Sequence, residues 1–148
     1  MATITGLRSP YEEVGGLVHF GRMLDKIRLM AEGKLPEDWA NAAGLEPGGF
    51  DARCMRFLKL NDYAALTERT LAGGSDEEIL QWAFETGRKP SDEEIETWNG
   101  YMTRRGWRDA TRARVLFRCE EAGISPEGIE TMFDFIDVDE GRPLRKFE

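Results

Sequence analysis

The chain has few of the residues on which metal and nucleophilic chemistry depend. Its 148 residues include one histidine, His19, and two cysteines, Cys54 and Cys119. A single histidine excludes multi-histidine zinc and iron sites, and the cysteines lack the close spacing of a zinc knuckle. We therefore expect no metal and no cofactor. A Ser-His or Cys-His nucleophile would need a partner that the fold brings close to His19.

Long apolar runs and an excess of positive charge are also missing. No run approaches the ~20 residues of a membrane helix, and residues 1–8 have neither the basic start nor the apolar stretch of a secretion signal. We expect a cytoplasmic protein whose cysteines remain thiols. The net charge of -8 argues against general affinity for nucleic acid or anionic membranes. The expected partner is a protein or a second copy of the chain.

Period-two alternation between hairpin turns is absent, which predicts an all-α fold without a sheet. Length and composition indicate a single compact domain over residues 1–148. We expect a long surface connection carrying Trp39 at about 34–49 and a charged tail from about 137. The expected helical elements, about seven or eight and all short, are a turn at 10–14 and helices at 18–32, 51–59, 62–72, 76–86, 92–105, 109–122 and 126–135.

Serine marks the expected helix starts. Ser9, Ser75 and Ser91 are each followed three residues later by glutamate, the spacing of a capping box. The segment from Ser75 to Trp82 recurs as Ser91 to Trp98, which indicates consecutive helices that begin with the same cap. Successive carboxylates on a helix point in different directions and make a poor metal cage. The apolar residues of both copies are therefore expected in the core, namely Ile79, Trp82, Ile95 and Trp98.

A candidate anion site lies at the start of the helix expected at 18–32. His19, Arg22 and Lys26 fall within about 60° of one another on the helical wheel, at a flank of the apolar stripe. Gly15 and Gly16 precede them and supply no capping side chain, so open amides beside cations could hold phosphate or carboxylate. The alternative, which we favour, is that Gly16 caps the helix through solvent, His19 packs, and the two cations pair with acidic residues.

A second basic cluster stands out against the acidic background, with only Asp109 opposing it. It consists of Arg104, Arg105, Arg108, Arg112, Arg114 and Arg118. Arginine forks suit phosphate and carboxylate, so RNA or an acidic partner could bind here, with Trp107 as a stacking surface. Eight acids lie between Asp76 and Glu96, and we favour intramolecular pairing with them.

Several short runs resemble the bacterial family known as Domain of Unknown Function 5069. They are Leu7-Arg8-Ser9-Pro10, Gly15-Gly16-Leu17-Val18-His19, Arg22-Met23-Leu24-Asp25-Lys26 and Glu94-Ile95 with Trp98-Asn99. The resemblance carries no established activity. It implies a small, cytosolic, single-domain bacterial protein, and it directs attention to His19, Arg22, Asp25 and Lys26.

The sequence therefore favours a non-enzymatic binding or protein-interaction module, which could self-associate through exposed aromatic or apolar surface. Four tryptophans in a small domain without a complete catalytic set support this expectation. The alternative is a protein or enzyme that binds an anionic small molecule at the Gly15-Gly16 helix start, with His19 as an acid or base beside Arg22 and Lys26. A third hypothesis is RNA contact through the arginine cluster.

Overall fold

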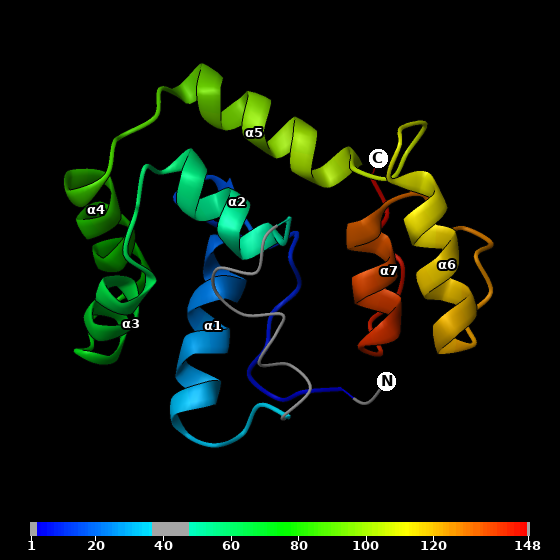
Figure 1. The fold of residues 1–148 in the computed structure, drawn as a ribbon, viewed down its shortest axis with the longest axis horizontal. Coiled ribbons are helices and arrows are strands. Elements are labelled where there is room, and N and C mark those ends of the chain that lie inside the picture. Colours follow the sequence, from blue (N-terminus) through cyan, green and yellow to red (C-terminus); the bar gives the residue numbers. More distant parts are fainter. Residues whose placement is uncertain (1–2, 37–47, 148) are drawn as a thin grey trace.

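The computed structural model describes residues 3–36 and 48–147. Seven helices and one two-stranded antiparallel sheet form in these residues, which confirms a mostly helical single domain (Figure 1). None of the described helices is long and apolar enough to cross a membrane. The part of the predicted connection that carries Trp39 lies outside the described residues. The elements are β1 (Glu13–Val14), β2 (Leu17–Val18), α1 (Phe20–Ala31), α2 (Phe50–Phe57), α3 (Tyr63–Leu71), α4 (Asp76–Thr86), α5 (Asp92–Arg104), α6 (Arg112–Ala122) and α7 (Met132–Asp139).

Helix α1 is the centre of the main core. Its side chains Phe20, Met23 and Leu24 have no exposed surface, and the helix packs against α2, α3 and β1. Met102 of α5 and Phe133 of α7 belong to the same cluster. A smaller apolar cluster joins α6 to α7, which lie side by side at the opposite end of the molecule from α3 and α4 (Figure 1).

The predicted starts of α4 and α5 are confirmed. The Ser75 hydroxyl accepts a hydrogen bond from the Glu78 amide at 3.2 Å, and the Glu78 carboxylate accepts one from the Ser75 amide at 2.9 Å. Ser91 and Glu94 repeat this capping box at 3.1 and 2.9 Å. The repeated apolar positions lie in or against the core: Ile79 and Trp98 are buried, and Trp82 and Ile95 are half-buried.

A β-hairpin stands where a helical turn was predicted at 10–14, so the expectation of no sheet was wrong. Gly15 and Gly16 form its two-residue turn with φ angles of 56° and 82°. Both angles are left-handed, a conformation that glycine adopts without steric cost and that hairpin turns require. Strands of two residues are too short to show alternation. The Gly-Gly pair between apolar residues was the one available signal.

The last helix begins later than predicted. Helix α7 starts at Met132, not near Pro126, because Thr131 and Asp134 form a capping box whose amide-to-side-chain bonds measure 3.1 and 3.2 Å. The helix therefore extends through the start of the predicted charged tail. Asp137 and Glu140 are only 2% and 3% exposed, so that part of the tail prediction was wrong.

Gly87 lies where two segments meet closely. The Arg88 amide donates to the Leu58 carbonyl at 2.9 Å, and a Cβ at Gly87 would lie 1.9 Å from that oxygen. Gly87→Ala should therefore lower the free energy of unfolding by about 1–3 kcal/mol, measured by urea denaturation. Gly100→Ala is the matched control, because its Cβ would meet only the Arg104 side chain and alanine favours a helix. Equal effects of the two substitutions would contradict this packing.

Candidate functional site

His19 occupies the junction between β2 and α1. Its backbone is left-handed, with φ 72°, and its side chain is 1% exposed. The Nε2 atom lies 2.7 Å from Asp51 Oδ1, and the ring lies near Phe50 and Phe133. Burial lowers the pKa of His19 below its ordinary value of 6.5, although Asp51 opposes this. The neutral ring then donates from Nε2, because an ionised carboxylate can only accept.

Asp51 also holds Lys26. The Nζ atom of Lys26 lies 2.8 Å from the same Asp51 oxygen, and the two residues are 4% and 2% exposed. Burial alone would raise the pKa of Asp51, but Lys26 and His19 hold it well below its ordinary value. Burial lowers the pKa of Lys26, while Asp51 favours its charged form. This buried carboxylate thus connects α2 to α1 and to the residue that precedes α1.

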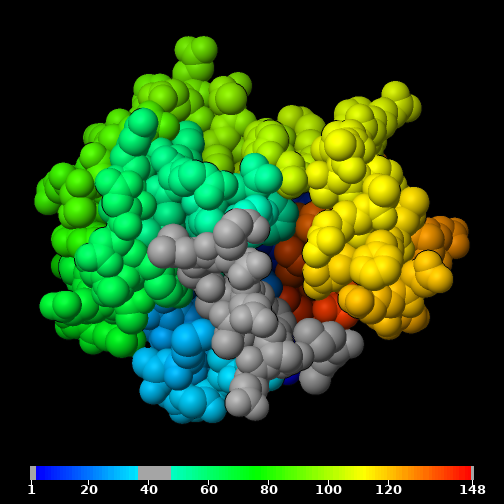
Figure 2. Space-filling view, in the orientation of Figure 1, coloured from blue at the N-terminus to red at the C-terminus, as the bar shows by residue number. Residues whose placement is uncertain are grey.

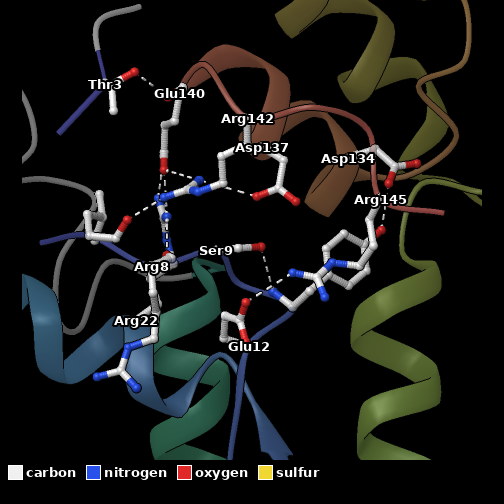
Figure 3. Close-up of polar contacts among 12 residues, drawn as sticks. Thr3, Arg8, Ser9, Glu12, Arg22, Asp134, Asp137, Glu140, Arg142 and Arg145 are labelled. Carbon is white, nitrogen blue, oxygen red and sulfur yellow. Dashed lines mark hydrogen bonds and ion pairs between the residues drawn. The ribbon is translucent and has the colours of Figure 1, made fainter. Parts of the chain in front are cut away.

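Arg22 makes the second buried ion pair. Its guanidinium donates to both Glu140 carboxylate oxygens, at 2.8 and 2.6 Å, and to the Arg8 carbonyl at 3.1 Å. Arg142 also donates to Glu140, at 2.8 Å, and it contacts Asp137 (Figure 3). Burial would raise the pKa of Glu140, but the two arginines lower it. Residues more than a hundred positions apart in the sequence are joined here.

A half-exposed layer of charges continues the network toward the surface. Arg8 donates to both Asp25 oxygens, at 2.8 and 2.9 Å, and to Asp76 at 2.7 Å. Arg28 donates to the other Asp76 oxygen at 2.8 Å. The Arg8 guanidinium also lies against Gly21, where a Cβ would approach it to 2.6 Å. These contacts attach the amino-terminal segment and the start of α4 to α1.

The family model described as Domain of unknown function (DUF5069) matches residues 4–142, nearly the whole chain. The chain belongs to this family. The matched span includes the whole charge network, from Arg8 to Arg142, and ends at its last residue. A comparison with curated proteins finds no match.

The predicted site residues of this DUF5069 chain lie in two separate places. His19 and Lys26 meet at Asp51, and Arg22 lies in the adjoining pair with Glu140. Gly15 and Gly16 lie instead in the hairpin turn, because β2 and the left-handed His19 precede the first residue of α1. They line a hollow of about 330 Å³ with α5 residues. Their predicted place at the helix start was therefore wrong.

Sequence reasoning did not identify the acidic partners. Asp51 was taken only as the first residue of a helix, and Glu140 as part of a solvated tail. Asp25, to which the family resemblance directed attention, is 7% exposed and bonded to Arg8. The acids at 51 and 140 lie 32 and 118 residues from their partners. No local signal in one sequence specifies such pairs.

The arrangement of these charged residues is that of a network that stabilises the fold. The network ties together the amino-terminal segment, α1, α2 and the end of α7, and each of its buried cations has a carboxylate within hydrogen-bond distance. Among the described residues, no three His, Cys, Asp or Glu side chains are grouped so as to hold a metal ion. Removing one partner of a buried ion pair is strongly destabilising, because it leaves the other charge buried without compensation.

Acid should destabilise the protein in two steps. His19 is the only histidine, and its folded pKa is lowered, so its contribution to stability is complete above pH 6.5 and is lost as the pH falls below that value. Asp51 and Glu140 have lowered pKa values, so their contributions are lost below about pH 4. Asp137, whose pKa burial raises, acts with the opposite sign. Urea denaturation from pH 7 to 5.5 should show a slope that His19→Gln removes; an unchanged slope would contradict this.

The predicted basic cluster lies on the surface around α6. Arg105 donates to the Tyr101 hydroxyl at 2.6 Å, Arg108 lies 5.1 Å from the Trp107 ring centroid, and Arg112 donates to the Ile129 carbonyl at 2.8 Å. Within the described chain, none of the six arginines pairs with an acid of residues 76–96. The favoured intramolecular pairing was therefore wrong, because these acids lie in α4 and near the start of α5, whereas the cluster begins at the opposite end of α5 (Figure 1).

Only one arginine of this cluster has a carboxylate within 4 Å in the part of the chain that the structure describes. That contact, between Arg118 and Glu121, is long at 3.8 Å and lies within one helix. Exposed apolar side chains accompany the arginines: Trp107 is 46% exposed, Leu116 42% and Phe117 55%. We call residues 105–118 the arginine–aromatic segment. In Figure 2 it lies within a raised lobe, coloured yellow, at one edge of the face shown.

Proposed function

We propose that the chain is a non-enzymatic protein-interaction module whose binding surface is the arginine–aromatic segment. The observation that carries the proposal is the combination of largely uncompensated positive charge and exposed aromatic surface on an acidic protein. Arg8, Arg28 and Arg142 each have a carboxylate within 3 Å, so the chain is able to neutralise its cations elsewhere. Exposed Trp and Arg side chains are also the residues that dominate binding energy at interfaces.

The partner that fits this segment is an acidic protein segment with apolar side chains. Its carboxylates would meet Arg108 and Arg114, and its apolar groups would cover Trp107 and Phe117. Nucleic acid fits less well because its continuous negative charge would face the remaining acidic surface of a chain with net charge -8. The proposal thus favours a protein partner over RNA.

The test is fluorescence anisotropy with a labelled peptide of glutamate and leucine. We expect saturable binding that weakens as salt is added. Arg108→Glu should weaken it about tenfold by placing like charge at the interface. Arg56→Glu, an exposed arginine on α2, is the matched control with the same charge change. Trp107→Ala should weaken binding without changing the net charge.

Any one of four outcomes would overturn the proposal. Absence of peptide binding, or equal effects of Arg108→Glu and Arg56→Glu, would show that the segment is not a specific surface. Tighter binding of a single-stranded RNA than of the peptide would replace it with the RNA hypothesis. Equal binding of a lysine and leucine peptide would show that charge complementarity plays no part.

A second function, binding of an anionic small molecule, is kept as an alternative for one reason. His19 combines a left-handed backbone with a buried Nδ1 that has no hydrogen-bond partner among the described residues, and strained or unsatisfied groups concentrate at functional sites. Against it, Asp51 and Glu140 already engage Lys26 and Arg22, so an anion would have to displace a carboxylate. A saturable rise of Tm with inorganic phosphate would favour this function.

The proposed setting is the bacterial cytoplasm. The described cysteines, Cys54 and Cys119, are buried free thiols, as expected in a reducing compartment. The family resemblance supports a bacterial origin.

A further inference from the structure

Helix α5 presents an outward stripe whose charge changes sign along its length. Ile95, Trp98 and Met102 face the core, and the residues on the opposite side of the helical wheel are Glu93, Glu96, Thr97, Gly100 and Arg104. All of these are exposed except Gly100, which is half-buried. In Figure 1, α5 runs along one edge of the molecule with no other helix outside it. The stripe therefore has acidic side chains at its start, small residues in its middle and a basic side chain at its end.

The charges of the stripe find no ion pair within the described chain. Neighbouring Glu94, which lies off the stripe, does pair with Arg88 at 2.5 Å. Glu93 and Arg104 cannot reach each other because eleven residues of helix separate them by about 16 Å. These charges are therefore available to pair with a second molecule.

Gly100 has no explanation inside the fold. It lies in the interior of α5, where glycine costs up to about 1 kcal/mol relative to alanine. Among the described residues, a Cβ there would meet only the end of the Arg104 side chain, at 3.3 Å, so their packing does not require glycine. A missing side chain at the middle of an exposed helical stripe does allow the backbone of a second helix to approach closely.

Two hollows lie beside the stripe. The larger, of about 680 Å³, is lined by Glu96, Thr97, Gly100 and Arg104 together with residues such as Tyr11 and Arg145. The smaller one lies at the hairpin turn and shares Glu96 and Asn99 with it. The surface along α5 is therefore concave enough to receive side chains of a partner helix.

We propose that two copies of the chain form a twofold-symmetric dimer in which their α5 helices pack antiparallel. An axis beside the midpoint of residues 98 and 99 places Glu93 of each copy opposite Arg104 of the other and Thr97 opposite Gly100. Symmetry forms each contact twice, and such a self-complementary interface closes at two subunits. The dimer goes beyond the acidic-partner function, because it uses the outward stripe of α5 and leaves the arginine–aromatic segment accessible.

Sedimentation equilibrium tests the dimer directly. We expect a species of twice the 16.8 kDa chain mass that dissociates as salt is added. Glu93→Arg alone, or Arg104→Glu alone, should weaken association about tenfold or more, because each opposes like charges twice. The double variant Glu93→Arg/Arg104→Glu restores opposite charges and should dimerise again. A mixture of the two single variants should likewise form a mixed dimer.

Two further variants separate this interface from a general charge effect. Glu77→Arg is the matched control, because Glu77 follows Ser75 in α4 as Glu93 follows Ser91 in α5; it should leave the dimer intact. Gly100→Leu should give a folded monomer, with helical content confirmed by circular dichroism. A monomer mass for the wild type at all concentrations would overturn the proposal, as would a dimer that ignores both charge reversals. Arg108→Glu should leave the mass unchanged, so failure of the dimer and failure of the acidic-partner surface are distinguishable.

Discussion

Arg22→Met is expected to lower the free energy of unfolding by about 3–5 kcal/mol. The substitution keeps much of the apolar stem but removes the guanidinium that donates twice to Glu140. The Glu140 carboxylate, which is 3% exposed, then has fewer positive partners. A buried charge with fewer partners raises the free energy of the folded state. Urea denaturation at pH 7 measures the loss.

The control is an ion pair at the surface. Arg145 and Glu12 lie 3.3 Å apart with side chains 36% and 54% exposed, so Glu12→Gln should cost about 1 kcal/mol or less. The double variant Arg22→Met/Glu140→Met should recover part of the loss, because it removes both buried charges together. An Arg22→Met protein within 1 kcal/mol of the wild type would contradict a structural role for the pair.

Asp51→Asn is expected to have an effect of similar size, about 3–5 kcal/mol at pH 7. The change deprives the buried Lys26 ammonium of the Asp51 carboxylate, although the amide can still accept from His19. The pKa of Lys26, already lowered by burial, should fall further. Since the unfolded chain then binds the proton more tightly than the folded protein, the deficit should shrink as the pH rises toward the ordinary lysine pKa of 10.5.

This pH dependence gives Asp51→Asn its own control. Urea denaturation at pH 7 and at pH 9.5 should show a smaller loss at the higher pH. Adding Lys26→Met should remove that difference and restore part of the stability. A deficit that is independent of pH, or that Lys26→Met deepens, would show that Asp51 does not act by compensating the Lys26 charge.

Local signals predicted much of the fold. The capping boxes at Ser75 and Ser91 place the starts of α4 and α5 correctly, because the interaction is complete within four residues. The hairpin was missed because its strands have two residues each. Helix α7 was misplaced because the Thr131 box uses aspartate, so the signal was overlooked rather than absent.

For the candidate site, the sequence predicted the basic residues but not their acidic partners. The helical wheel placed Arg22 and Lys26 on one side of α1, because a helix fixes the directions of its own side chains, and His19 joins them from the residue before the helix. It could not show that Asp51 and Glu140 meet them, since those contacts depend on the packing of α2 and α7. The same limit applies to the second cluster. Its arginines were expected to pair with acids inside the chain, but they remain at the surface.

We therefore infer different roles for two groups of cations. Arg22 and Lys26 of α1 are buried and neutralised by acids from distant segments, which suits a stabilising role. Those of the arginine–aromatic segment are exposed or half-buried near the exposed Trp107 and Phe117, and they have little internal compensation. Binding is proposed at the second group, because only there would a partner gain attraction without displacing a carboxylate of the fold.

One measurement tests this division most directly: an amide NMR titration of the ¹⁵N-labelled chain with the glutamate and leucine peptide, followed by a separate titration with inorganic phosphate. The account predicts that the peptide shifts amides within residues 105–118 and that phosphate leaves those of residues 19–26 unchanged. Shifts in residues 19–26 with phosphate, together with none in residues 105–118 with the peptide, would contradict it.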